Sequence, residues 1–351
     1  MRIDVKALRV EEIIRDLSDK LKVPTLNESG FLSIKIPKDL GEGFIHGASF
    51  DSGMGIMSFY CKFNQDVAIH FSLDTVHPLK FIFCSQGQVV HTFQECKEDH
   101  FIETYQNIIV SSSGYNGHAL HFKANLQTHV SSLEIIRNKF SNRPNYDFED
   151  LDLNLKELFG EAVPKKPFFY QGHYSLKAAD VMEEMISRKY TGFLRSIFLE
   201  GKSFEMLVIQ ISQYLDDQTG DRLPKILRKS DIKKVDFVVR RVLCNLGSNL
   251  SVESLAREAG TNVNKLQEGF KHEYKLTVNK YMQNKKLEAA KEMLMSSDKN
   301  ISEIVTAIGL NNRSYFSKIF KEKYGVNPKY FLKTRKNEVW GTKLEVTNEQ
   351  G

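Results

Sequence analysis

The C-terminal third of this 351-residue chain contains one pattern twice, and the copies are about 50 residues apart. Each copy has a short segment with apolar residues at helical spacing, a glycine (Gly260 or Gly309) and a second such segment. Glycine tolerates the left-handed backbone in which many helices end, so each copy predicts two helices joined by a tight turn. Asn262 and Asn311 are placed to cap the second helix by accepting a hydrogen bond from a free backbone N–H.

The second helix of each copy has an apolar pair at positions i and i+4, which must face the first helix. This plan is a helix-turn-helix, whose second helix enters the major groove of DNA. We expect two units, at about 252–274 and 301–324, joined by a helix from about 278 to 295. Such a helix spans roughly 27 Å, so the units can enter successive major grooves, ~34 Å apart, on one face of double-stranded DNA. The apolar pairs are Leu266 with Phe270 and Phe316 with Phe320.

Positive charge is concentrated in the same region. Residues 221–336 contain 25 Lys and Arg against 12 Asp and Glu, a net charge of +13, whereas residues 1–220 have a net charge of −6. This asymmetry indicates a polyanion-binding module joined to a part that need not touch the polyanion.

The second unit contains an ordered set of residues: Ile301-Ser302-Glu303-Ile304, Ser314-Tyr315-Phe316, Phe320-Lys321, Gly325 and Pro328. With this set and the double helix-turn-helix, residues of about 236–334 closely resemble the DNA-binding domain of AraC/XylS-type transcription regulators. Val305 stands where the family usually has Ala, Leu310 where it has Phe, and Lys275 where the first unit often has Gly. These departures imply altered packing and not the loss of the fold.

A second resemblance is carried by residues 200–205 and by Thr277-Val278, and it is to the branch typified by siderophore-responsive regulators. Together the resemblances imply a transcription regulator whose N-terminal domain binds a small-molecule effector. They also imply activation as the commoner mode of control, RNA polymerase as a partner, and a place in the cytoplasm at the nucleoid.

Candidate DNA contacts are the polar residues on the outer faces of the two second helices. Asparagine and glutamine suit adenine edges, glutamate can accept from cytosine, and arginine or lysine can read guanine or hold phosphate. The resemblance places base contacts at six of them: Asn264, Gln267, Glu268, Arg313, Ser314 and Lys318. The full set is Asn264, Lys265, Gln267, Glu268 and Lys271 in the first unit and Arg313, Ser314, Ser317, Lys318 and Lys321 in the second.

The N-terminal part has a period of two instead of a helical period. Apolar residues alternate with polar ones at 67–73, and several further short stretches between 31 and 110 are similar. Glycines such as Gly41 and Gly43 are interpreted as turn signals. Residues 1–145 therefore predict an antiparallel β-rich sensor domain, a cupin-like barrel or a sandwich, after an amphipathic helix at 1–23. Further strands are expected at 31–36, 56–63, 79–84, 88–93 and 105–110.

Helical coupling is expected between the sensor and the basic region. Residues 146–220 include a strongly apolar stretch from 204 to 215, which either packs on the β-rich domain or forms a homodimer interface. Residues 221–235 are interpreted as a linker, 236–334 as the DNA-binding domain and 335–351 as a tail. The sequence thus predicts a multidomain α+β protein with an all-α C-terminal double helix-turn-helix domain.

A metal-binding cupin-like enzyme and an architectural DNA-binding protein are the alternatives. Eight of the ten histidines lie between 46 and 129, but His118 and His121 do not form the His-x-His pair that places two ligands on one face of a strand. Nucleotide-binding and hydrolase signatures are absent, and the four cysteines form no Cys-x-x-Cys pair. We expect no catalytic residue, metal or cofactor, histidines that line a pocket or are hydrogen-bonded, and, without an apolar run near 18 residues or a signal peptide, no membrane association.

Overall fold

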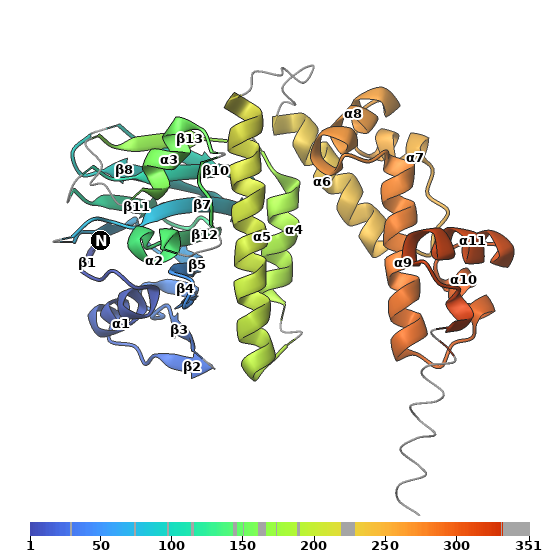
Figure 1. The fold of residues 1–351 in the computed structure, drawn as a ribbon, viewed down its shortest axis with the longest axis horizontal. Coiled ribbons are helices and arrows are strands. Elements are labelled where there is room, and N and C mark those ends of the chain that lie inside the picture. The colour runs from blue at the N-terminus through green and yellow to red at the C-terminus, as the bar shows by residue number, and fades with distance from the viewer. Residues whose placement is uncertain are drawn as a thin grey trace, which may run out of the picture. The chain divides into compact units, whose positions relative to one another are not determined.

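The computed structural model describes residues 1–28, 30–73, 75–96, 98–113, 116–142, 146–149, 151–160, 166–172, 174–187, 190–218, 229–330 and 332. The chain divides into two compact units, residues 1–224 and 225–351 (Figure 1), and each is described by itself. Residues 221–228 of the expected linker and the expected tail at 335–351 lie outside the described residues. Among the residues that the structure describes, no helix is long and apolar enough to cross a membrane.

The N-terminal unit is built from two β-sheets that enclose one apolar core. The sheet orders are β1-β6-β11-β8-β9 and β13-β10-β7-β12-β5-β4-β3-β2. The rings of Phe59 in β5 and Phe122 in β11 lie 5.3 Å apart and connect the two sheets across the core. The predicted β-rich domain is thereby confirmed. The strands are β1 (Arg2–Val5), β2 (Leu26–Glu28), β3 (Phe31–Lys35), β4 (Gly41–Ser49), β5 (Met54–Phe63), β6 (Val67–Phe71), β7 (Leu79–Gln86), β8 (Gln88–Phe93), β9 (His100–Glu103), β10 (Asn107–Ser111), β11 (His118–Phe122), β12 (Thr128–Ile135) and β13 (Phe168–Gln171).

The N-terminal 23 residues differ from the single helix that the sequence predicts. They form strand β1 and then helix α1 (Val10–Leu21). Ile3 and Val5 are buried because β1 pairs in parallel with β6. Helix α1 begins after Arg9, whose backbone N–H donates to the Glu12 carboxylate at 3.2 Å. The apolar spacing of this segment fits both structures, and the contact with β6, distant in sequence, selects the strand.

Glycines that were interpreted as turn signals lie inside strand β4. A Cβ atom at Gly43 would lie 1.9 Å from the carbonyl oxygen of Tyr60 in β5, so these two strands approach too closely for any side chain there. The same sheet receives β13 from beyond residue 145, where we expected the β-rich part to end. Strand β13 pairs with β10 in antiparallel orientation.

Helices α4 (Leu176–Ile186) and α5 (Gly192–Gln218) lie side by side next to the sheets (Figure 1). The C-terminal half of α5 is fastened to the β-rich part by two hydrogen bonds. Asn107 of β10 donates to Gln213 at 2.5 Å, and Asn154 donates to the Tyr214 hydroxyl at 3.1 Å. The helical region therefore packs on the β-rich domain, which was one of the two alternatives. The shorter helices are α2 (Arg137–Ser141) and α3 (Leu153–Phe159).

The described part of the C-terminal unit is helical, and its two helix pairs lie where the repeat predicts. The backbone at both turn glycines is left-handed, with φ +62° at Gly260 and +67° at Gly309. Asn262 caps its helix as expected, accepting from the Lys265 N–H at 2.8 Å. The helices are α6 (Lys229–Cys244), α7 (Val252–Glu258), α8 (Val263–Tyr274), α9 (Val278–Ser296), α10 (Ile301–Ala307) and α11 (Arg313–Tyr324).

Two details of this unit correct the sequence analysis. Asn312, not Asn311, caps α11, accepting from the Tyr315 N–H at 2.9 Å, because the second turn is one residue longer than the first. Helix α6 occupies residues 229–235, for which a linker was expected. It packs closely on α8, since a Cβ atom at Gly269 would lie 2.5 Å from Cγ2 of Val235.

Helix α9 belongs to both helix-turn-helix units. In its first half Tyr281 packs on Phe270 of α8, with ring centroids 5.3 Å apart. In its second half Leu287 and Leu294 share a buried core with α10 and α11. One helix therefore contributes to the core of each unit.

The two helix-turn-helix units also meet directly beside α9. A Cβ atom at Gly309 would lie 2.4 Å from the carbonyl oxygen of Gly247, so the two backbones are in contact. The Lys286 ammonium on α9 donates to the carbonyl oxygens of Ser248 and Gly309, each at 3.4 Å. The joint between the units is thus made of backbone and one lysine.

Helices α8 and α11 end in the same left-handed conformation but with different residues, Lys275 at φ +55° and Gly325 at φ +76°. A side chain in this conformation costs roughly 1 kcal/mol more than glycine. We expect Lys275→Gly to raise the free energy of unfolding of the C-terminal unit by about 0.5–1 kcal/mol and Gly325→Lys to lower it by a similar amount. Hydrogen exchange of buried amides in α8, α9 and α11 of the full chain measures both changes, and shifts of the same sign would contradict the prediction.

Candidate DNA-binding interface

The predicted contact residues of α8 lie on the face opposite the core. Leu266 and Phe270 are buried, as their spacing requires. Asn264 and Glu268 are exposed, whereas Gln267 is only half-exposed. Lys265 and Lys271 are also exposed.

Gln267 makes a structural hydrogen bond that the sequence did not reveal. Its Oε1 accepts from the backbone N–H of Val278, the first residue of α9, at 3.1 Å. A bidentate contact with adenine needs the amide oxygen and the amide nitrogen together. Gln267 can read adenine in that way only by giving up this bond, so its first role is to tie α8 to α9.

On α11 the buried residues are again the predicted apolar pair, Phe316 and Phe320. The candidate residues lie on the other side of the helix. Arg313, Ser314, Lys318 and Lys321 are exposed, and Ser317 is half-exposed.

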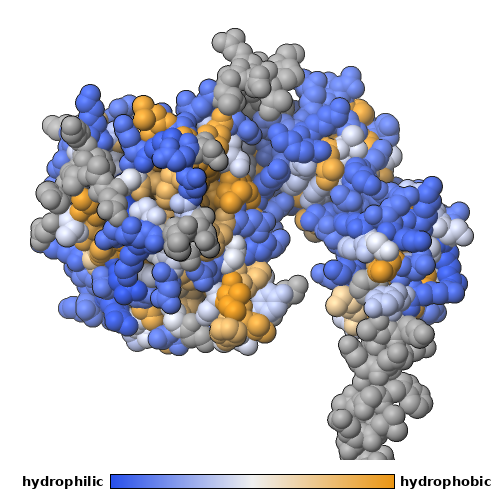
Figure 2. Space-filling model, viewed as in Figure 1, coloured by the Kyte–Doolittle hydropathy of each residue, from blue (hydrophilic) through white to orange (hydrophobic). Residues whose placement is uncertain are grey.

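The positive charges on these faces are available to an anion. Surface ion pairs would have to be broken before a lysine or arginine could bind phosphate, but among the described residues these side chains form none. Figure 2 shows hydrophilic side chains over most of the visible face of this unit. The five cations are Lys265, Lys271, Arg313, Lys318 and Lys321.

The sequence analysis missed Tyr315 as a contact candidate. This side chain is 46% exposed on α11, and its hydroxyl accepts from Gln283 Nε2 of α9 at 2.9 Å. Gln283 Oε1 in turn accepts from the Lys280 ammonium at 2.8 Å. The signal was its place directly before the buried Phe316, which turns Tyr315 outward.

A cleft between α9 and α11 contains this hydrogen-bonded chain. Its polar side chains are donors of the kind that hold phosphate oxygens. Burial lowers the pKa of Lys286 at its edge. The cleft is lined by Thr277, Asn279, Lys280, Gln283, Lys286 and Tyr315 together with Leu250, Met282, Leu310 and Ile319.

The histidines of the N-terminal unit fall into two groups. His121 and His129 have side-chain partners, Thr92 at 2.9 Å and Gln127 at 3.1 Å. His77, His91 and His118 are buried and have ring nitrogens with no hydrogen-bond partner among the described residues. Within those residues no group of three histidine, cysteine or acidic side chains could hold a metal ion.

Two helix pairs with polar outer faces, held by one shared helix, define a DNA-binding protein of the double helix-turn-helix class. The family comparisons agree with this class. Residues 255–334 match the family described as a helix-turn-helix domain, and residues 42–226, more than half of the chain, match the family described as the regulatory protein PchR N-terminal domain. The chain therefore belongs to the AraC-type transcription regulators with a PchR N-terminal domain.

Individual relatives are more distant. The chain is 27% identical over 167 residues to the transcriptional activator PerA of Escherichia coli, covering 48% of this chain and 57% of PerA. It is 29% identical over 120 residues to the bifunctional transcriptional activator/DNA repair enzyme AdaA of Bacillus subtilis, covering 34% of this chain and 54% of AdaA. The chain thus spans about half the length of these curated relatives. A crystal structure of apo ToxT from Vibrio cholerae aligns with a TM-score of 0.32 and 15% identity over 80% of this chain and 97% of ToxT.

Gln267 and Asn264 are expected to differ when each is replaced by alanine. Gln267→Ala should lower the free energy of unfolding by about 1 kcal/mol and weaken binding to all DNA sequences alike, because it removes a bond between helices. Asn264→Ala should leave stability unchanged and cost ~1–3 kcal/mol of discrimination at one base pair. Binding to a library of operator variants, measured with thermal unfolding, separates the two. A loss of preference at one base pair in Gln267→Ala would contradict the structural role.

Proposed function

We propose that this chain is a sequence-specific transcription regulator, an activator that binds double-stranded promoter DNA through the major groove. The observation that carries the proposal is the pair of outward faces on α8 and α11, with five cations free of ion pairs. Asn264, Glu268 and Arg313 are our candidates for base contacts, and Lys265, Lys271, Lys318 and Lys321 for phosphate. The proposal places the chain in the cytoplasm at the nucleoid, with RNA polymerase as a partner, and it includes no catalytic step.

Control by a small molecule completes the proposal. The N-terminal unit has its own core and is separated from the DNA-binding unit in the sequence, as a sensor domain would be. An effector that binds one arrangement of the chain better than another shifts the population by its difference in affinity. Helix α5, fastened to the sheets at Gln213 and Tyr214, is the element through which the sensor leads into the rest of the chain.

The proposal is tested by genome-wide footprinting of the tagged chain with Arg313→Ala beside it. We expect discrete promoter peaks that Arg313→Ala loses. If Arg313 binds phosphate, the log–log salt dependence of operator binding should fall by about 0.9. If it reads guanine, preference at one base pair should relax by ~1–3 kcal/mol instead.

The matched control is Lys123→Ala, which removes one exposed positive charge from the N-terminal unit. It should leave the peaks and the salt dependence unchanged. An absence of discrete peaks for the unmodified chain in every growth condition would contradict sequence-specific regulation.

Helix α5 also supports a homodimer. Several large apolar side chains on one face of this helix are exposed, Phe193 at 75% and Ile197 at 53% among them, although exposed apolar patches are rare on monomers. Covering them with a second copy removes this surface from water. The remaining members are Leu194 and Val208.

We therefore expect the full chain to sediment as a dimer and the double variant Phe193→Asp, Ile197→Asp to sediment as a monomer. Burying two carboxylates in an apolar interface would weaken the association at least a hundredfold. Leu153→Asp is the control, since Leu153 is 71% exposed at the start of α3. A strictly monomeric profile of the unmodified chain, with and without operator DNA, would refute the dimer.

A further inference from the structure

A layer of buried polar side chains crosses the interior of the N-terminal unit. Its members come from both sheets and from the segment before β7, and none is more than 3% exposed. The layer consists of His77, Lys80 of β7, His91 of β8, His118 of β11, and Ser132 and Glu134 of β12.

Strand periodicity places these side chains in the interior. Ile82 of β7, Leu120 of β11 and Val130 of β12 belong to the core between the sheets. Lys80, His118 and Ser132 are two residues away from these, so they point to the same side. The layer is thus the polar end of an otherwise apolar core.

The groups of the layer are close to one another. The Lys80 ammonium lies 2.6 Å from Glu134 Oε1 and 4.5 Å from the ring centre of Phe71. The rings of Phe71, His118 and His91 follow one another as a stack, with centroids 4.8 Å and 5.3 Å apart. The His77 ring lies 6.0 Å from that of His118.

Most of these groups have polar atoms with no hydrogen-bond partner among the described residues. The atoms are His77 Nε2, both ring nitrogens of His91 and His118, Ser132 Oγ and Glu134 Oε2. Buried polar groups are nearly always bonded, because an unbonded one has lost water and gained nothing. So many in one layer indicate a ligand that supplies their partners.

The charges of the layer restrict what this ligand can be. Burial, together with His100 and the Lys80 ammonium, lowers the pKa of His91 to about 3, and burial with Lys80 and Arg137 lowers that of His77 to about 4. Each imidazole is therefore neutral, with one N–H donor and one acceptor nitrogen. Lys80 and Glu134 cancel, so an added anion would lie near Glu134 without a cation of its own.

We infer that this layer is the effector site, and that it takes an uncharged, ring-shaped compound with both hydrogen-bond donors and acceptors. The ring lies against the stack of Phe71, His118 and His91, and a donor of the ligand meets Glu134 Oε2. The inference rests on the proposed function only in naming the ligand an effector.

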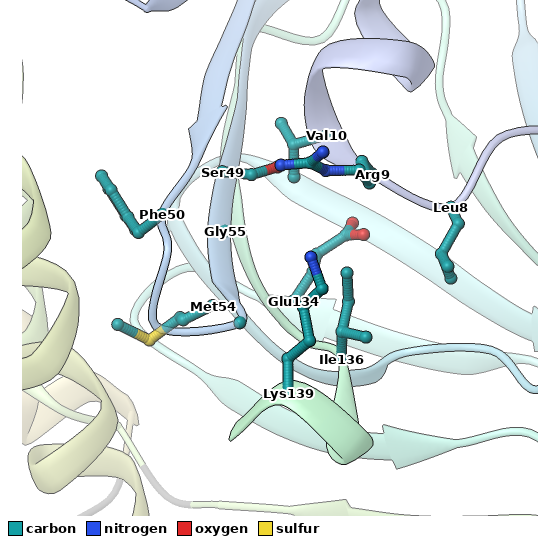
Figure 3. A pocket seen from close by; sticks show the side chains of 11 residues that line it. Leu8, Arg9, Val10, Ser49, Phe50, Met54, Gly55, Glu134, Ile136 and Lys139 are labelled. Carbon is teal, nitrogen blue, oxygen red and sulfur yellow. The ribbon is translucent and has the colours of Figure 1, made fainter. Parts of the chain in front are cut away.

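Glu134 also connects the layer to the surface. Its side chain lines a pocket formed by residues just before and at the start of α1, by the β4–β5 turn and by α2. Figure 3 shows the Glu134 carboxylate, Arg9 and Lys139 pointing into the same space. Because Arg9 and Lys139 are exposed, the pocket gives the ligand a route to Glu134.

The test uses two probes of the same shape, 4-hydroxybenzamide and the anion 4-hydroxybenzoate, with the full chain and ligand-observed NMR. We expect the amide to bind at least about tenfold more tightly than the anion. His118→Phe keeps a ring of similar size but removes both nitrogens, and it should weaken amide binding about tenfold or more. His121→Phe is the matched control, because His121 lies on the same strand but is bonded to Thr92 outside the layer, and it should change binding less than about twofold.

Three results would overturn the inference: no amide binding, equal binding of the anion, or amide binding that His118→Phe leaves unchanged, which would mean that ordered water alone partners the layer. If His118→Phe does not fold, Ser132→Ala removes one unbonded hydroxyl with little change in shape and should still weaken the amide. Footprinting is read independently, so promoter peaks without amide binding would refute this inference while leaving the proposed function in place.

Discussion

The spacing of the two recognition helices depends on the burial of α9 against both helix pairs. Tyr281 anchors its first half to α8 through Phe270, and Leu287 and Leu294 anchor its second half to α10 and α11. An isolated helix of 19 residues would be marginal in water, so this packing and not helix propensity holds it straight. The two reading heads therefore move as one body, and their separation is a property of the core.

The bond from Gln267 to Val278 joins this framework to the reading surface. A side chain on the outer face of α8 caps the helix that fixes the distance between the heads. Recognition and rigidity thus share one residue in the first head. On the second head Tyr315 and Gln283 form the corresponding link between α11 and α9. Each recognition helix is held to the shared helix by one polar contact.

The C-terminal unit was predictable because its signals are local. A glycine, a capping asparagine and an apolar pair four residues apart fix a helix pair within about 25 residues, and both pairs lie where the repeat placed them. The N-terminal unit depends on contacts between distant residues. Gly43 is required by the approach of Tyr60, and Ile3 becomes part of a strand only because β6 is beside it. The Gln267 bond and the buried histidine layer escaped prediction for the same reason, since both join segments whose distance the sequence does not state.

The backbone contact between Gly247 and Gly309 gives the proposed regulator a ruler. A side chain at Gly309 would need about 1 Å of extra room to reach an ordinary van der Waals distance, which is a third of the ~3.4 Å rise between stacked bases. Such a wedge would turn one recognition helix out of phase with its groove while leaving every base-reading side chain intact. The operator would then be recognised by the interval between its two halves as well as by their letters, and this interval is set by two residues that have no side chain.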